Sequence, residues 1–212
     1  MKQLIVLIAS LLLVLQCTTQ EKTEWIDVTP GPNLEGWTIV NIPPDQPLNP
    51  VQQWSVTGDK IVRCSGQGGH EWLRYDLEQF SDCVFHLEWR FLKLDKPAKY
   101  NSGVYVRNNA DGTIWHQVQT GDASGGYLFG KTLRNGEIVR QSLRDKMESS
   151  PVKPAGEWNR FDITCSGAAI TVVVNGVPTV TWNDLQVRSG YVGLEAEGYA
   201  VEFRNLRVKK IK

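Results

Sequence analysis

The segment from Val84 to Leu92 holds the residue pair best suited to chemistry. Glu88 and Arg90 stand two positions apart in it, and on a β-strand they would share one face because side chains alternate between faces. A carboxylate beside a guanidinium can act as a general base or substrate clamp with a partner for a developing oxyanion. The alternative is an ion pair that only covers the sheet, which is the commoner arrangement when the residues are considered alone.

Polar residues of two later segments are candidates for the border of a binding site. Asn101 precedes a segment in which Tyr105 and Arg107 share a face, so all three could border one concave sheet surface. Gln117 and Gln119 share a face of the next apolar segment and are further candidates for substrate binding. The alternative is ordinary turn chemistry for Asn101 and a solvated side chain for Arg107.

His116 and Asp122 are two further candidates for catalysis. His116 falls on the apolar face of its segment with Ile114 and Val118, which favours a buried core histidine over a base, although an imidazole titrates near neutral pH. Asp122 lies in the Gly-rich turn 121–126, where a backbone can approach a ligand and a carboxylate can bind calcium. A loop-capping Asp is the alternative there. A divalent metal such as Ca²⁺ is the one cofactor that the sequence suggests.

Glu195 and Glu197 are predicted to form a paired carboxylate. They stand two positions apart near the end of an apolar segment, so both can point the same way. Solvated charges are the alternative. A sugar could stack on Trp72, Tyr105 or Trp115, although aromatic rings of this kind also serve as core.

The elements that must position these residues are predicted to be short β-strands. From Trp54 onward, β-branched and aromatic runs alternate with turn residues, and no stretch carries a helical apolar stripe. Val84–Leu92 is the clearest strand, because apolar and polar side chains alternate along it. Asn175-Gly176 between Ile170–Val174 and Val177–Trp182 predicts a hairpin with a type I′ turn.

Other local signals complete this prediction. Gly58-Asp59 and Asp111-Gly112 are turn candidates, and Leu143–Glu148 could form one helical turn. The proline-rich opening from Trp25 to Pro50 indicates an extended segment along a sheet edge, because proline cannot donate a ladder hydrogen bond. The fold class expected is an all-β sandwich or barrel.

Composition restricts the partners. The 212 residues are 41% hydrophobic, which suits one domain, and they include eight Trp. Lys plus Arg equals Asp plus Glu at 23 each, so neither nucleic acid nor an anionic membrane surface is an expected partner. The sequence also lacks a nucleophile elbow, a phosphate-binding loop and an H-E-x-x-H motif.

The N-terminus predicts export. Residues 1–16 resemble a bacterial lipoprotein signal peptide, with an apolar run from Leu4 to Leu15 that is too short to span a bilayer. Cys17 would be the lipidated residue, although Gln16 replaces the usual small residue and ordinary secretion is the alternative. Residues 17–23 would be a tether and 24–212 the domain. The location expected is the periplasm, the outer membrane or the cell surface, with membrane contact through the lipid alone.

The cysteines that remain after Cys17 are expected to be buried free thiols. Cys64, Cys83 and Cys165 are odd in number and show no zinc-site spacing, so at most one disulfide could form among them.

A family resemblance rests on short segments in a fixed order: Phe85–Arg90, Asn101–Arg107, His116–Gln119, Lys153–Asn159, Val174–Gly176, Gly193–Glu195 and Glu202–Arg207. Together they resemble the 3-keto-disaccharide hydrolase domain, a family of secreted and lipoprotein domains, over roughly Trp25 to Ile211. The resemblance implies a concanavalin A-like jelly-roll β-sandwich of two antiparallel sheets. The chain departs from the family at Gln117, where Glu is common, and at Ala196-Glu197-Gly198, where some members carry Asp-His-Gly.

The resemblance implies a substrate that is already oxidised at C3 of a sugar. A ketone there acidifies the C2 hydrogen, so one base and an enolate stabiliser could expel the C1 substituent, without the two opposed carboxyls of ordinary glycosidases. With the resemblance, Glu88 and Arg90 become the favoured catalytic pair. A non-catalytic carbohydrate-binding module is the alternative, favoured by Gln117, and a structural surface lipoprotein that binds another protein is a third possibility.

Overall fold

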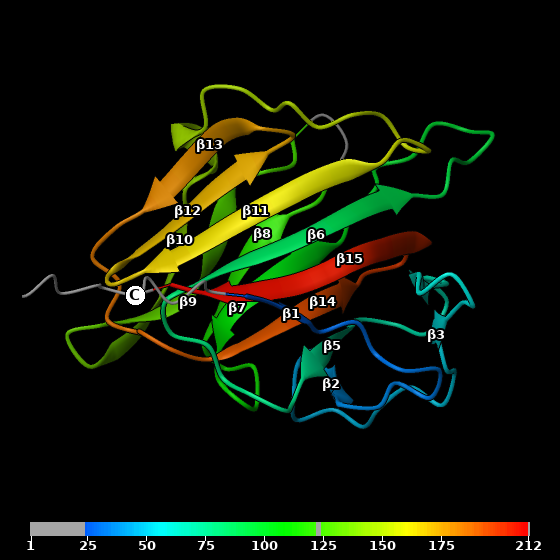
Figure 1. The fold of residues 1–212 in the computed structure, drawn as a ribbon, viewed down its shortest axis with the longest axis horizontal. Coiled ribbons are helices and arrows are strands. Elements are labelled where there is room, and N and C mark those ends of the chain that lie inside the picture. Colours follow the sequence, from blue (N-terminus) through cyan, green and yellow to red (C-terminus); the bar gives the residue numbers. More distant parts are fainter. Residues whose placement is uncertain (1–23, 122–123, 212) are drawn as a thin grey trace, which may run out of the picture.

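The computed structural model describes residues 24–121 and 124–211. Over these residues the chain forms two antiparallel β-sheets packed face to face, one of eight strands and one of seven (Figure 1). The all-β jelly-roll sandwich of two antiparallel sheets expected from the sequence is confirmed. Within the described residues, no helix is long and apolar enough to span a membrane.

The eight-stranded sheet contains, in spatial order, β13 (Val177–Trp182), β12 (Ala169–Val174), β11 (Asn159–Ser166), β6 (Cys83–Phe91), β15 (Val201–Lys210), β4 (Val62–Cys64) and β3 (Trp54–Val56), with β1 (Trp25–Asp27) paired to β15. The seven-stranded sheet contains β10 (Glu137–Ser142), β9 (Leu128–Arg134), β8 (Trp115–Gln119), β7 (Gly103–Asn108), β14 (Tyr191–Ala196), β5 (Glu71–Tyr75) and β2 (Trp37–Asn41). A 3₁₀ turn, η1 (Arg144–Lys146), lies in the segment expected to form one helical turn.

The hydrophobic core lies between the two sheets. The alternation predicted for Val84–Leu92 is confirmed on β6, where Phe85, Leu87, Trp89 and Phe91 are buried. Trp89 packs edge-to-face against Phe91 at 5.6 Å between ring centroids. Because one face of each sheet is used for this core, most polar side chains of the strands point outward on the two opposite surfaces of the sandwich.

The turn chemistry predicted from the sequence is confirmed at several corners. Asn175 and Gly176 adopt φ angles of 50° and 87° and join β12 to β13, the positive values that a type I′ turn requires. Gly112, with φ of 72°, lies in the connection from β7 to β8. The opening segment supplies β2 at one end of the seven-stranded sheet, which confirms its edge position.

Candidate functional site

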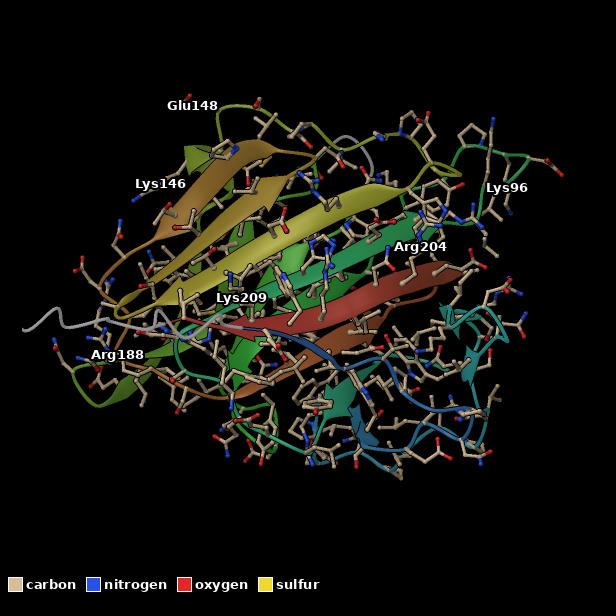
Figure 2. All side chains as sticks on the ribbon, viewed as in Figure 1. Lys96, Lys146, Glu148, Arg188, Arg204 and Lys209 are labelled. Carbon is tan, nitrogen blue, oxygen red and sulfur yellow. The ribbon has the colours of Figure 1, made fainter. Side chains whose placement is uncertain are left out.

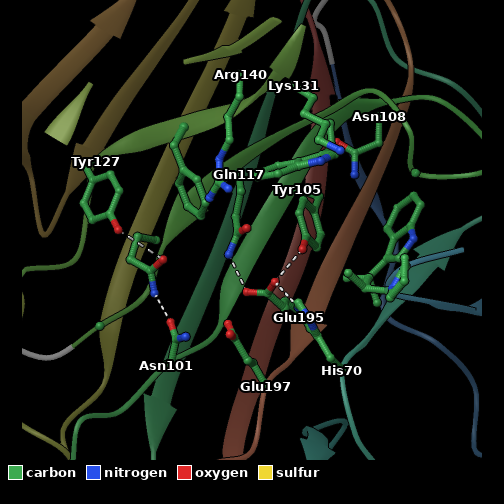
Figure 3. Close-up of a pocket in the computed structure, with 18 of the residues that line it drawn as sticks. His70, Asn101, Tyr105, Asn108, Gln117, Tyr127, Lys131, Arg140, Glu195 and Glu197 are labelled. Atoms are coloured by element: carbon green, nitrogen blue, oxygen red, sulfur yellow. Dashed lines mark hydrogen bonds and ion pairs between the residues drawn. The ribbon is translucent and has the colours of Figure 1, made fainter. Parts of the chain in front are cut away.

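A pocket with a volume of about 670 Å³ opens on the outer face of the seven-stranded sheet (Figure 3). Its walls are side chains from β5, β14, β7, β8, β9 and β10, so the pocket crosses most of the sheet. This volume is typical of sites that hold a small molecule.

Glu195 is the most buried acidic group of the pocket. Its side chain, on β14, is 3% exposed. Tyr105 donates a hydrogen bond to Oε1 at 2.5 Å, and Nε2 of His70 lies 2.9 Å from the same oxygen. Gln117 donates to Oε2. Burial and the charge of Glu195 raise the pKa of Tyr105 well above its ordinary value, so its phenol stays protonated and keeps donating.

Glu197 is the second carboxylate and is half-buried in the pocket. Burial and the charge of Glu195 raise the pKa of Glu197, and His70 offsets this only in part. Burial lowers the pKa of His70, but the hydrogen bond and charge of Glu195 and the charge of Glu197 outweigh it and leave the pKa raised. The charge of Glu195 therefore raises the pKa of both His70 and Glu197.

The same three side chains could hold a divalent cation. One ligand atom each from His70, Glu195 and Glu197 lies within 4.8 Å of the others, and in Figure 3 all three converge on one point of the pocket. An imidazole with two carboxylates suits a transition-metal ion or zinc, whereas calcium prefers oxygen ligands alone. The donor set of His70, Glu195 and Glu197 therefore fits a transition-metal ion or zinc.

Aromatic side chains flank the acidic centre on both sides. The ring of Tyr105 lies 5.5 Å from Trp72 on β5 and 6.2 Å from Trp115 on β8, in edge-to-face geometry. Trp115 in turn contacts Phe129 on β9 at 5.1 Å. Such rings offer flat apolar surfaces on which a sugar can stack.

Two glycines leave the space that the site requires. A Cβ added at Gly103 would lie 2.6 Å from Cγ of Gln117, and one at Gly193 would lie 2.8 Å from Cζ3 of Trp72. Both approaches are closer than van der Waals contact permits, so these strand glycines allow Gln117 and Trp72 to lie flat against the sheet.

The structure brings together the sequence candidates Asn101, Tyr105, Gln117, Gln119, Glu195 and Glu197, which all line the pocket. Gln119 donates hydrogen bonds to Asn101 and, at 3.0 Å, to the carbonyl of Ser102, so it also fixes the loop before β7. That these residues bind a substrate stays a prediction.

Glu88 and Arg90 are not part of this pocket, which corrects the expectation that they form the site. They lie on β6 of the opposite sheet and face away from the core. They do not pair with each other: Arg204 donates to Glu88 at 2.6 Å, and Arg90 donates to Glu202 at 2.8 Å. Alternation showed correctly that both leave the core, but it does not indicate which of the two sheets the strand joins.

The ion pairs of Glu88 and Arg90 belong to an outer layer over the eight-stranded sheet. The guanidinium groups of Arg90 and Arg204 lie 4.5 Å and 3.9 Å from the ring centroid of Trp158. Figure 2 labels Arg204, which belongs to β15, on this surface. Ion pairs that cover the sheet were the alternative expected from the sequence. The structure shows them, with partners on the neighbouring strand β15.

His116 and Arg107 also lie outside the pocket. His116 is fully buried between the sheets, 3.0 Å from Oγ1 of Thr132, and burial lowers its pKa to about 4. His116 is therefore the core histidine expected from its position on the apolar face of the strand, and it is not exposed to act as a base.

Arg107 is 1% exposed, and its guanidinium donates to the carbonyl of Gly167 at 2.9 Å and to Asp82 at 3.2 Å. Its φ of 53° breaks the alternation that would have placed it beside Tyr105.

Some candidates lie outside the described residues, namely Asp122, Cys17 and the proposed signal peptide. Among the residues that the structure does describe, Cys64, Cys83 and Cys165 are buried free thiols, as expected.

Sequence reasoning missed His70, Lys131 and Arg140, which line the pocket. His70 stands two positions before Trp72, so alternation could have placed both on one face. No local signal marks Lys131 and Arg140, because only the pairing of β9 with β10 brings them to the pocket.

The fold places the protein in the class of jelly-roll β-sandwich domains. Carbohydrate-binding module CBM66 from Bacillus subtilis superposes with a TM-score of 0.61 at 13% identity, covering 82% of this chain and 96% of that one. A candidate glycosyl hydrolase from Parabacteroides distasonis gives 0.60 at 17%, covering 89% and 100%. Bacillus licheniformis β-glucanase gives 0.55 at 10%, covering 90% and 98%. At these identities the similarity establishes the fold alone.

The chain belongs to the family described as the 3-keto-alpha-glucoside-1,2-lyase-like domain, which it matches over residues 24–209. The resemblance inferred from the sequence is therefore confirmed. No curated protein sequence matches the chain significantly.

Proposed function

We propose that the protein cleaves 3-keto-glycosides in this pocket by removing the proton at C2 and eliminating the substituent at C1. The observation that carries the proposal is Glu197, a half-buried carboxylate that opens into the pocket and has a raised pKa beside Glu195. A base whose pKa lies nearer the working pH transfers protons more effectively. Family membership supplies the substrate class.

The proposed reaction conserves atoms and charge over two steps. Glu197 takes the C2 proton, and the electrons of the C2–H bond form a C2=C3 double bond with negative charge on the C3 oxygen. When the C3 ketone re-forms, the C1–O bond breaks, a C1=C2 double bond appears, and the departing oxygen takes the proton from Glu197, which becomes a carboxylate again. Water can later add to C1, which completes a net hydrolysis.

The other polar groups of the pocket would position Glu195 and stabilise the enolate. Tyr105, Gln117 and His70 hold Glu195 in one orientation through their hydrogen bonds. Without a metal, His70, whose raised pKa favours the protonated form, would supply positive charge beside Glu195. If neutral His70 instead held a divalent cation together with Glu195 and Glu197, that cation would polarise the C3 ketone as a Lewis acid.

A non-catalytic carbohydrate-binding module is the second candidate function. Gln117 supports it, because an amide stands where the family commonly carries a carboxylate, and its hydrogen bond engages Glu195. Trp72 and Trp115 could hold a sugar without any chemistry.

We also propose that the protein works outside the cytoplasm, anchored by a lipid on Cys17. The short apolar run from Leu4 to Leu15, followed by Cys17, supports this. An oxidised glycoside would then be met in the periplasm or at the cell surface.

Glu197→Gln should abolish turnover without abolishing binding. Removing a general base typically lowers the rate by about 100-fold to 10,000-fold, while the amide keeps the shape of the side chain. The measurement is release of the aglycone from a 3-keto-glucoside and from its unoxidised parent, with and without EDTA. We expect release from the keto sugar alone, and loss of release in EDTA if a metal takes part.

Glu88→Gln is the matched control, because Glu88 lies on the opposite face of the sandwich. It should leave turnover unchanged. Binding of sugar with no release by the native protein would contradict the enzymatic proposal and support the binding module.

A further inference from the structure

Two cations line the pocket at the end away from the carboxylates. Lys131 on β9 and Arg140 on β10 are direct partners in the antiparallel register, and both side chains reach the pocket. In Figure 3 they extend into it from the side opposite Glu197. Among the described residues, no ion pair joins either of them to a carboxylate.

This placement is unfavourable for the empty protein. Like charges directly opposite each other on neighbouring strands destabilise a sheet. An anion between the two groups would remove the repulsion and accept hydrogen bonds from both. The guanidinium of Arg140 in particular can bind a carboxylate or sulfate through two parallel hydrogen bonds.

The surface beneath the cations is aromatic. Lys131 is the register partner of Trp115, and Phe129, which also lines the pocket, lies two residues before it on the same strand. A flat apolar surface beside two cations fits a sugar ring that carries an acidic group.

We propose that the substrates are acidic glycosides, in which the part beyond the scissile bond carries a carboxylate or sulfate group that Lys131 and Arg140 bind. This inference rests on the proposed function of the same pocket. β9 lies three strands from β14, which carries Glu195, and at about 4.8 Å per strand this is roughly 14 Å. Because Lys131 and Arg140 extend back into the pocket, the anionic group falls on the neighbouring sugar ring.

The charge distribution also sets the orientation of the substrate. Glu195 and Glu197 offset the positive charge of His70 and Lys99, which also line the pocket, whereas Lys131 and Arg140 form no ion pair with any residue that the structure describes and attract an anion. A glycoside with one acidic end is therefore directed to place its neutral, oxidised ring at the carboxylates.

The test is equilibrium binding by calorimetry of three unoxidised disaccharides: glucosyl-glucuronic acid, glucosyl-glucose carrying a 6-sulfate on the second ring, and neutral glucosyl-glucose. At low salt we expect at least one anionic disaccharide to bind roughly tenfold more tightly than the neutral one. The advantage should shrink at about 1 M salt, which shortens the screening length to about 3 Å. Comparison of the two anionic ligands distinguishes carboxylate from sulfate.

Variants assign the effect to the two side chains. Lys131→Met and Arg140→Met should each weaken anionic binding by roughly fivefold, the usual size for one exposed charge pair, and should not change neutral binding. Lys146→Met, a cation outside the pocket lining, is the control. Equal affinity for all three ligands, or a preference that survives in both variants, overturns the proposal.

Turnover separates this inference from the proposed function. If the anionic preference is present and keto-glycosides are not cleaved, the acidic-ligand site stands and the catalytic proposal fails. If keto-glycosides are cleaved and binding is indifferent to charge, the reverse holds.

Discussion

Three kinds of donor reach Glu195 at once, a phenol, an amide and an imidazole. A carboxylate that is nearly fully buried would cost several kcal/mol if left without partners. Its partners therefore fix it in place, while Glu197 faces the pocket and has a pKa raised by burial and by Glu195. The two carboxylates differ in environment, which is why the proposed mechanism assigns positioning to Glu195 and the role of base to Glu197.

The pairing of His70 with Glu195 predicts a pH dependence of stability. Because the pKa of His70 is raised in the folded protein, its contribution is fully present below the unfolded value of about 6.5 and is lost as pH rises through the folded value. The Tm of the native protein should therefore fall as pH rises above about 6.5, and this fall should be smaller in His70→Gln. Below that pH the variant should simply have the lower Tm. Thermal unfolding of both proteins over a pH series measures this. Parallel Tm curves for the two proteins would show that the pair contributes nothing.

Among the strands, β7 and β8 hold Glu195 in place because Gly103 on β7 lets the side chain of Gln117 on β8 lie close to the backbone. Gly103 begins β7 and is the register partner of Gln119, and its missing side chain leaves the space that Gln117 occupies. The position of Gln117 therefore depends on the neighbouring strand as much as on its own.

Gly103→Ala should displace Gln117 and weaken its hydrogen bond to Glu195. We expect turnover to fall by roughly tenfold, which corresponds to about 1.4 kcal/mol, and overpacking to lower the free energy of unfolding by about 1–3 kcal/mol. Gly58→Ala is the control, because a Cβ there meets no atom within 4 Å. Turnover assays and urea unfolding of both variants measure these two changes. Native turnover in Gly103→Ala would mean that Gln117 has no role in positioning Glu195.

At the scale of the whole molecule, the two outer faces carry separate sets of charges. The pocket occupies the face of the seven-stranded sheet. The opposite face carries Glu202, which accepts hydrogen bonds from Arg63 and Arg90. Burial raises the pKa of Glu202, but these two arginines outweigh it and leave the pKa lowered. The core between the sheets separates this network from the site.

Glu202→Gln should therefore lower stability and leave function intact. The loss of two charge-assisted hydrogen bonds at a buried carboxylate is worth about 1–3 kcal/mol in the free energy of unfolding. The effect should diminish toward low pH, because stabilisation by a lowered acid pKa is lost as pH falls through that value. Urea unfolding and turnover of the variant measure the two quantities. A change in turnover at native stability would show that the faces are coupled.

Local spacing and turn chemistry in the sequence were enough to predict the all-β class, the strand alternation and the Asn175-Gly176 turn, and the resemblance of short motifs in a fixed order indicated the family. Alternation also showed that Glu88 and Glu195 point away from the core, whereas His116 points into it. It could not show which sheet a strand joins, since that depends on pairing between segments far apart in the chain. Only the tertiary structure placed Glu88 and Glu195 on opposite surfaces and brought His70 beside Glu195, because β5 and β14 meet across more than a hundred residues of chain.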